Sequence, residues 1–205
     1  MNSSLKTYIE THILPQYEHF DKGHNIEHIQ SVIKESLLIA KDYDVSEDMV
    51  YTIAAYHDIG IPKGRDLHHI YSGEFLLQDA HLNQWFSTEE IQTMKAAIED
   101  HRASSKNEPR SIYGKIISEA DRQLDCETII RRTIQFSLKN FPNYTFDEHY
   151  QRIIGHIQEK YGENGYLKLW IKSKRNEKGL ADIRQLLKNK SLFKQKVIEL
   201  YEKQQ

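Results

Sequence analysis

Apolar residues recur every three or four positions along most of this 205-residue chain, a spacing typical of amphipathic α-helices. Capping residues mark where several of these helices begin. Asn25 and Ser46 each precede an apolar stripe, and Ser87 and Thr145 are each followed three residues later by glutamate, which is the pattern of a capping box. No segment alternates apolar and polar residues between hairpin turns. The pattern therefore predicts an all-α protein.

The predicted helices divide into a core and an appendage. The core helices cover residues 5–20, 25–43, 46–57, 68–80, 87–101 and 112–139, and the later helices cover residues 145–161 and the stretch from 172 onward. Pro15 and Asp125 are positions where a helix is expected to break. We interpret residues 1–140 as a compact helical core and residues 141–205 as a helical appendage packed on it. A homodimer interface is the alternative use of the appendage's apolar faces.

Composition narrows the class of protein. Hydrophobic residues make up 39% of the chain and charged residues 28%, which fits a soluble, helical protein. The formal net charge of -2 gives no field that would attract a nucleic-acid polymer or an acidic membrane surface. Cys126 is the only cysteine, so no intrachain disulfide can form, and we expect a cytoplasmic protein. Neither a membrane span nor a signal peptide is predicted.

The stretch from Tyr51 to Pro62, YTIAAYHDIGIP, places two polar side chains at the end of a predicted helix. His57 falls on the apolar face of that helix, and Asp58 follows it directly. Gly60 is expected to end the helix in a left-handed conformation. A buried imidazole and carboxylate are costly unless they are paired. The two residues therefore form either a hydrogen-bonded pair in the core or part of a divalent-metal site.

Other residues of the same chemistry lie on or beside predicted helices with an apolar stripe: His28, His69, His101 and Asp121. A lone histidine in such a place is more often a hydrogen-bonded core residue than a metal ligand. Six histidine and aspartate residues at helix ends or on inward stripes are harder to explain in that way. We therefore interpret the whole set as candidate metal ligands.

Three stretches, HNIEHIQSVIKESLLIA, AAYHDIGIPKG and GKIISEADRQLD, keep the order His…His-Asp…Asp along about residues 20–130. In this order the chain resembles the HD-domain superfamily of metal-dependent phosphohydrolases. The resemblance implies a helical bundle of the HD-domain type in which His28, His57, Asp58 and Asp121 bind one divalent metal ion. It also implies that His57 and Asp58 are central to catalysis.

Some members of that superfamily hold a second metal ion through two further histidines between the pair and the final aspartate. His69, in HIYSG, and His101, in AIEDHRAS, match that pattern, which implies that Asp58 bridges two ions. Histidine and carboxylate ligands suit Fe, Mn, Co, Ni or Zn. In single-metal members the extra histidines instead help to bind phosphate. His68 adjoins His69 and is expected to point elsewhere, toward solvent or a phosphate.

Several cations near these residues are candidates for binding substrate phosphate. Lys63 and Arg65 follow the His-Asp pair on a short loop, where members of the superfamily often carry a phosphate-contacting lysine. Arg122 follows the last candidate aspartate, and His24 lies one turn before the first candidate histidine. Lys63, Arg65 and Arg122 could equally be solvated surface charges, and His24 could face the substrate or support a metal ligand.

The polar, basic loop from Arg102 to Arg110 joins two candidate ligands, so we expect it to border the site. Cations at such a border would pair with the charges of several phosphate groups. We therefore expect a small phosphorylated substrate, a nucleotide, with a di- or triphosphate preferred over a monophosphate.

These features predict an enzyme, a metal-dependent phosphohydrolase that cleaves a phosphoester or phosphoanhydride with a metal-activated water. Two alternatives remain open. A non-enzymatic, metal-stapled domain would bind a nucleotide and release no phosphate. A di-iron oxygenase of the same superfamily would require O₂ and iron specifically.

Overall fold

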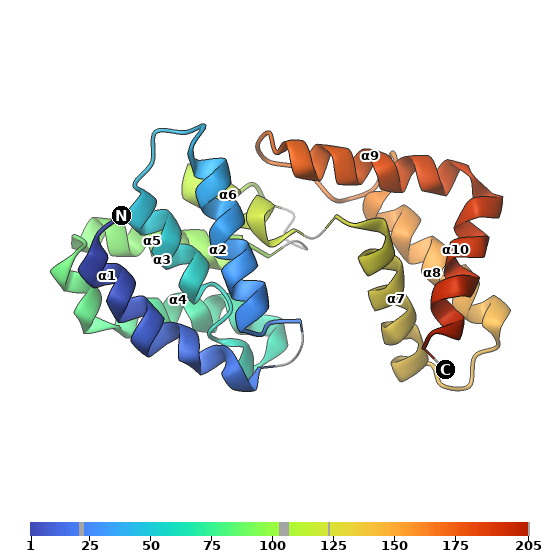
Figure 1. Cartoon of the computed structure of the whole chain (residues 1–205), viewed down its shortest axis with the longest axis horizontal. Coiled ribbons are helices and arrows are strands. Elements are labelled where there is room, and N and C mark those ends of the chain that lie inside the picture. The colour runs from blue at the N-terminus through green and yellow to red at the C-terminus, as the bar shows by residue number, and fades with distance from the viewer. Residues whose placement is uncertain (21–22, 103–106, 123, 205) are drawn as a thin grey trace. The chain divides into compact units, whose positions relative to one another are not determined.

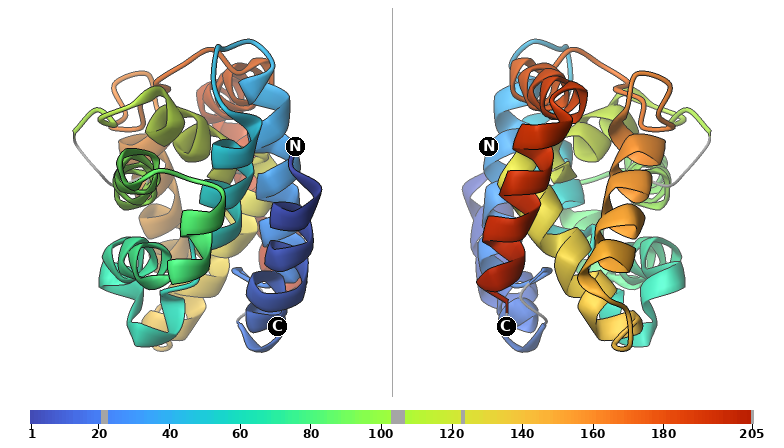
Figure 2. Two further views of the ribbon diagram at one scale, coloured as in Figure 1. Left: turned by 90° about the vertical axis from the view of Figure 1, so that its left-hand side faces the viewer. Right: turned by 90° about the vertical axis from the view of Figure 1, so that its right-hand side faces the viewer.

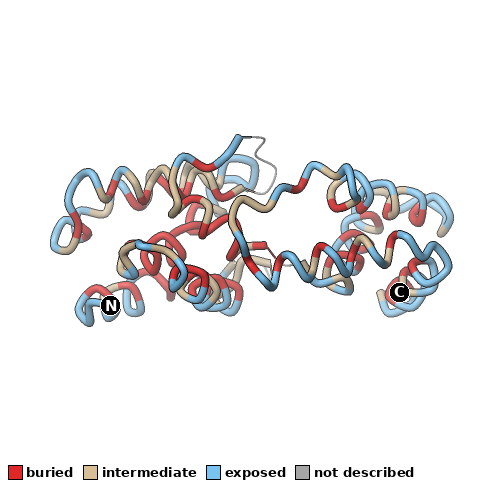
Figure 3. Tube along the Cα trace, turned by 90° about the horizontal axis from the view of Figure 1, so that it is seen from above, coloured by how far each residue is buried: buried red, intermediate tan, exposed pale blue. Residues whose placement is uncertain are grey.

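The computed structural model describes residues 1–20, 23–102, 107–122 and 124–204, which form helices and turns without a strand. This confirms the predicted all-α fold class. The contacts between residues divide the chain into two compact units, Met1–Arg122 and Gln123–Gln205 (Figure 1). Buried positions lie on the inward faces of the helices in each unit (Figure 3).

The first unit contains six α-helices among its described residues. They are α1 (Ser3–Tyr8), α2 (Ile26–Ala40), α3 (Glu47–Tyr56), α4 (His68–Gln78), α5 (Thr88–Asp100) and α6 (Ile112–Asp121). Short 3₁₀ helices cover Ile61–Lys63, Arg65–Leu67 and Ala80–Gln84. The single helix predicted over residues 5–20 instead changes type, from α1 through a π-helix at Ile9–Ile13 to a 3₁₀ helix at Leu14–His19. Pro15 lies in the first turn of that 3₁₀ helix, where its missing N–H costs least.

Local capping explains where the main helices begin. Asn25 Oδ1 accepts a hydrogen bond from the backbone N–H of His28 at 3.1 Å, and the hydroxyl of Ser46 caps α3 in the same way. Ser87 and Glu90 form the predicted reciprocal capping box at the start of α5. These bonds join residues three apart in sequence, which is why the pattern predicted them.

Helix α3 is the centre of the first unit. Every residue from Met49 to Tyr56 is buried, because α2, α4, α5 and α6 all pack against it (Figure 2). A helix that is apolar on all sides belongs in a core. Its last turn is followed by His57 and Asp58, so these two polar residues are carried into the interior, where they are 0% and 3% exposed.

Gly60 does not adopt the predicted left-handed conformation, since its φ is -79°. A Cβ at this position would lie 2.5 Å from the backbone nitrogen of Ser72 and 2.6 Å from the carbonyl oxygen of His68. Glycine is therefore required by the close approach of α4. The positive φ among the described residues, 140°, belongs to Gly64.

Asp79, just after α4, ties the N-terminal helix to α3. It accepts hydrogen bonds from the hydroxyl groups of Tyr8, at 2.7 Å, and Tyr56, at 2.5 Å. Despite the effect of burial, these hydrogen bonds lower the pKa of the Asp79 carboxyl group.

The second unit contains α7 (Cys126–Asn140), α8 (Phe146–Tyr161), α9 (Lys174–Lys188) and α10 (Lys190–Glu202). Helix α7 packs against α8, α9 and α10 (Figure 2). Its buried residues Ile130 and Ile134 join a separate core with Ile153, Phe193 and Val197.

This packing moves the boundary that the sequence predicted near residue 140. In the sequence, residues 112–139 form one apolar-striped run with a break near Asp125, which predicts that α7 belongs to the core. In the structure, the contacts of α7 place it in the second unit. The packing of the appendage on the core stays a prediction.

Candidate metal centre

Five helix ends of the first unit supply the side chains of this centre. His28 lies in the first turn of α2, and His57 and His101 directly follow the last residues of α3 and α5. His68 is the first residue of α4, and Asp121 is the last residue of α6. Side chains that are far apart in sequence therefore come together at the buried end of α3.

The first group consists of His28, His57, Asp58 and Asp121. The Nε2 atom of His28 lies 3.6 Å from Asp58 Oδ2 and 3.2 Å from Asp121 Oδ1. The Nε2 atom of His57 lies 3.3 Å and 3.9 Å from the same two oxygens. Two ligand atoms bound tetrahedrally to one metal ion with bonds of ~2.1 Å are ~3.4 Å apart. The four side chains thus have the spacing of ligands that share one ion.

The second group consists of Asp58, His68 and His101. Asp58 Oδ1 lies 3.3 Å from His68 Nε2 and 3.6 Å from His101 Nε2. The two Nε2 atoms are 3.3 Å apart. Asp58 therefore turns one carboxylate oxygen toward each group, which is the arrangement of a carboxylate that bridges two metal ions.

Backbone carbonyl groups fix the tautomer of three of these histidines. The Nδ1–H groups of His57, His101 and His68 donate to the carbonyl oxygens of Ala54, Ile98 and Arg65, at 2.8, 2.6 and 2.6 Å respectively. In each case the acceptor lies three residues earlier in the chain. Because a carbonyl oxygen can only accept, the proton is on Nδ1, and the neutral ring presents the lone pair of Nε2 to the group. This is the form of imidazole that binds a metal ion.

The donor atoms fit a divalent metal ion. The Nε2 atoms of His28 and His57 are buried, and neither has a hydrogen-bond partner among the described residues. The Nε2 atoms of His68 and His101 lie 3.3 Å apart, an arrangement that requires a proton or a metal ion between them. The ligand atoms of His28, His57 and Asp58 lie close enough together to hold one ion, as do those of Asp58, His68 and His101. Asp121 adjoins the first of these sets through its contacts with His28 and His57. Nitrogen and oxygen donors of this kind suit first-row divalent metals.

The charges within the centre are mutually stabilising. Burial opposes ionisation of Asp58, but His57, His101 and His28 hold the pKa of its carboxyl group well below the usual value. Burial also disfavours a charged His28, yet Asp121 and Asp58 raise the pKa of its imidazole to about 9. In the metal-free chain a proton on His28 therefore partly balances the two carboxylates. A metal ion bound there would replace that proton.

The structure places His68, and not His69, beside Asp58. Successive residues of an α-helix point ~100° apart, so only one of two adjacent histidines can face the group. His68 is held in place by its hydrogen bond to the Arg65 carbonyl. His69 takes no part in either group, and burial lowers the pKa of its half-buried ring to about 4. The side chain beside Asp58 is thus that of His68, and the ligand role predicted for His69 stays a prediction.

Two of the four predicted phosphate contacts lie on the exposed loop between α3 and α4. The ammonium group of Lys63 lies over the ring of Phe75, 4.5 Å from the ring centroid. Arg65 is exposed, and its carbonyl group orients His68. From these positions, the side chains of Lys63 and Arg65 would have to move or extend to contact a substrate phosphate.

The other two predicted phosphate contacts lie closer to the first group. His24 is half-buried, and its ring stands edge-on to that of His28 with 6.1 Å between centroids. Arg122 is buried and forms an ion pair with Glu119, which is fully buried one turn earlier. The guanidinium group of Arg122 thus has a partner within α6, and its predicted phosphate contact stays a prediction.

The loop after α5 is more constrained than the sequence suggested. Arg110 pairs with Asp100 and Glu99, so its charge is already balanced. Arg102 donates from Nη1 to the carbonyl oxygen of Asp66 at 2.6 Å and thereby ties the end of α5 to the loop before His68. No local sequence pattern indicates this tether, because it joins residues that are 36 positions apart. Residues 103–106, which were part of the predicted basic border, lie outside the described residues.

The comparison with family models found a similarity for part of the chain. The HD-domain model matches residues 25–123, just under half of the chain. These residues are similar to an HD domain. The match includes every residue of both groups, from His28 to Asp121, and ends at the boundary between the two units. Neither the comparison with curated proteins nor that with solved structures gave a match.

Within the part of the chain that the structure describes, no helix has the length and apolar character needed to cross a membrane.

Proposed function

We propose that the first unit of this chain is a metal-dependent phosphohydrolase that cleaves a phosphoester or phosphoanhydride bond of a nucleotide. The observation that carries the proposal is the position of Asp58, whose two oxygens face two groups of buried histidines. A single hydrogen-bonded core pair would need only one histidine. The HD-domain match supports the same reaction class.

His28, His57, Asp58 and Asp121 would hold one ion, and Asp58, His68 and His101 a second. Bound there, divalent ions supply a water of lowered pKa and a Lewis acid for a phosphoryl oxygen. The residues of the chain do the positioning: Asp58 keeps the two groups together, and the backbone bonds keep His57, His68 and His101 in the ligand tautomer. Preorganised ligands of this kind need little rearrangement when substrate binds.

The proposed substrate carries more than one phosphate group. His24 stands beside the first group, and Arg65 and Lys63 lie on the loop that leads to His68. Cations at these places suit the charge of a nucleoside di- or triphosphate better than that of a monophosphate.

The test is a phosphate-release screen on the full-length chain. The protein is freed of metal with a chelator and reconstituted separately with Mn, Fe, Co, Ni and Zn ions. It is then offered nucleoside mono-, di- and triphosphates at equal concentration. We expect release that depends on the metal, is lost in Asp58→Asn and is kept in Asp66→Asn, which removes an exposed carboxylate of the neighbouring loop.

Two results would favour the alternatives. Nucleotide binding without phosphate release under any metal would indicate a binding domain. Product formation that requires iron and consumes O₂ would indicate the oxygenase chemistry.

A further inference from the structure

The charge of the chain is unevenly divided between its two units. Met1–Arg122 contains 12 Lys and Arg residues against 20 Asp and Glu, a net charge of -8. Gln123–Gln205 contains 16 against 10, a net charge of +6. The expectation that no nucleic-acid polymer binds rested on the whole-chain value of -2, which hides this asymmetry. A charge difference of this size between parts of a chain is a recognised sign of a polyanion partner.

The positive charge of the second unit is concentrated between α8 and the first turns of α9. Residues 166–178, YLKLWIKSKRNEK, are called the basic segment below. The segment holds five cations and one carboxylate, a net charge of +4 in 13 residues. Its cations are Lys168, Lys172, Lys174, Arg175 and Lys178, and all five are exposed.

The non-helical half of the basic segment has an outward side that is aromatic and cationic. Tyr166, Lys168 and Lys172 are exposed and Leu167 and Ser173 are buried, while Leu169, Trp170 and Ile171 are all half-buried. The ammonium group of Lys168 lies 6.0 Å from the centroid of the Trp170 ring, which puts these two side chains on the same side of the segment. With the exposed Tyr166 and Lys172, which lie at or next to bends of the backbone, the outward side thus carries a row of two aromatic rings and two ammonium groups.

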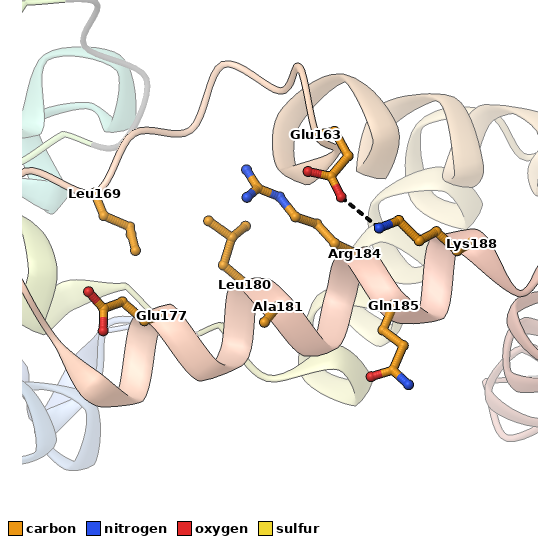
Figure 4. Close-up of a pocket in the computed structure, with 8 residues that line it drawn as sticks. All are labelled: Glu163, Leu169, Glu177, Leu180, Ala181, Arg184, Gln185 and Lys188. Atoms are coloured by element: carbon orange, nitrogen blue, oxygen red, sulfur yellow. Dashed lines mark ion pairs between the residues drawn. The ribbon is translucent and has the colours of Figure 1, made fainter.

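The inward side of the same row is apolar and faces α9. Figure 4 shows Leu169 pointing toward Leu180 across a groove with a volume of about 560 Å³. The groove is also lined by Glu177 and by Glu163, which pairs with Lys188 at 2.9 Å. Because Arg184 and Lys188 also line it, the two carboxylates are matched by two cations, and the groove adds no net positive charge to the surface. The row of outward side chains is the part of the segment that can attract an anion.

We propose that the basic segment is a binding site for single-stranded nucleic acid. Lys168, Lys172 and the cations at the start of α9 would pair with phosphate groups, and the rings of Tyr166 and Trp170 would stack on bases. An unpaired strand exposes both its phosphate groups and the faces of its bases. Cationic groups can pair with the phosphates, and aromatic rings can stack on the bases. The bases of a duplex are already stacked on one another, so the rings would have no surface to contact.

The distribution of apolar groups sets this partner apart from a lipid surface. A membrane-binding segment turns its aliphatic side chains outward, toward the acyl chains. Here Leu167 is buried, and Leu169 and Ile171 are half-buried. The side chains of the row in the exposed class are those of Lys168, Lys172 and Tyr166, the last of which is 48% exposed.

Fluorescence anisotropy with labelled 15-nucleotide oligo(dT) and oligo(U) tests the proposal on the full-length chain. With four or five phosphate contacts, a single strand should bind with a slope of log K against log salt of about -3, since each contact contributes ~-0.7. The double variant Lys168→Ala/Lys172→Ala should reduce the size of the slope by ~1.4. The matched control Lys139→Ala/Lys190→Ala removes the same charge from exposed sites of the second unit and should leave the slope unchanged.

Stacking has its own readout. Trp85 and Trp170 are the two tryptophans of the chain, so Trp85→Phe leaves Trp170 as the reporter. Its fluorescence should be quenched by the oligonucleotide. Tyr166→Leu, which changes an exposed side chain and should not disturb folding, is expected to weaken binding about tenfold, in line with ~1–3 kcal/mol per stacked base.

Three results would overturn the proposal. The first is a loss of binding in the control variant as large as that in Lys168→Ala/Lys172→Ala. The second is tighter binding of a duplex than of a single strand of the same length. The third is displacement of the labelled strand by vesicles of phosphatidylserine and phosphatidylcholine at a lower concentration than unlabelled oligonucleotide requires. Failure of oligonucleotide binding would leave phosphate release by the first unit unaffected, so the two proposals can fail separately.

Discussion

The adjacent histidines of α4 offer a direct test of the metal centre. His68→Ala removes one of three side chains from the second group, whereas His69→Ala removes an equally large ring from the next position without touching either group. The sequence resemblance favours His69 as the ligand, and the geometry favours His68. The two variants therefore give opposite answers under the two interpretations.

The size of the effect follows from the number of ligands lost. A four-ligand zinc site is worth about 10–16 kcal/mol at neutral pH, or about 3 kcal/mol per ligand. Losing one ligand of the second group should then raise the Kd for the ion bound there by roughly 100-fold. The first group keeps all four of its side chains in His68→Ala. We therefore expect the content of bound metal to fall from about two ions per chain to about one.

Equilibrium dialysis against a limiting concentration of Mn or Zn ions, followed by elemental analysis, measures this content. Circular dichroism and urea unfolding of both variants check that the fold survives. His69→Ala should keep two ions, because its cost is confined to the packing of a half-buried ring. If His69→Ala loses one ion while His68→Ala keeps two, the assignment of the second group is wrong.

Three further predictions concern the fold and the shared ligand. Asp58→Asn should lower the affinity at both groups at once, so elemental analysis should find fewer than one ion per chain while circular dichroism stays unchanged; retention of two ions would contradict the bridging position. Gly60→Ala should destabilise the fold by about 1–3 kcal/mol in urea unfolding, because the added methyl group overlaps the backbone of α4. Gly155→Ala, in α8 with nothing within 4 Å of the added Cβ, should instead stabilise by about 0.5–1 kcal/mol, and equal effects would refute the packing argument. The pKa of the Asp79 carboxyl group is lowered in the folded state. Its contribution to the stability of the fold is therefore present above its ordinary pKa of 3.8 and is lost as the pH falls below that value. As the pH is lowered through this range, the free energy of unfolding of Asp79→Asn should therefore fall less steeply than that of the parent chain.

The parts of the structure that the sequence predicted are those set by neighbouring residues. Asn25, Ser46 and Ser87 cap their helices through atoms two to four residues away, and such bonds do not depend on the rest of the fold. The burial of His57 followed from an apolar stripe on its own helix. The His-Asp pair and the final aspartate came together because their flanking sequences resemble those of a known family.

The parts that the sequence could not predict depend on contacts between distant elements. The choice between His68 and His69 is a question of how α4 is rotated about its axis, and both residues adjoin the same apolar stripe. That rotation is set where Gly60 meets the backbone of α4, a contact between segments that only the fold brings together. In the same way, the ring of Phe75 holds the ammonium group of Lys63, and nothing in the loop sequence indicates it.

The hydrogen bonds of His57, His68 and His101 to carbonyl groups three residues earlier have a consequence for how such a centre can be built. In many metal sites a carboxylate from elsewhere in the fold orients the ligating imidazole, so the ligand depends on a remote partner. Here each imidazole and its acceptor lie within four consecutive residues at the end or the start of a helix. Carbonyl groups in the last turn of a helix lack α-helical partners, which suits those of Ala54 and Ile98 to this use. The carbonyl oxygen of Ile98 accepts both the backbone N–H and the Nδ1–H of His101, and that of Arg65 lies in the short 3₁₀ helix before α4. Each ligand is thus a self-contained unit that can be set in its binding form before the helices dock, and tertiary packing has only to bring the units together.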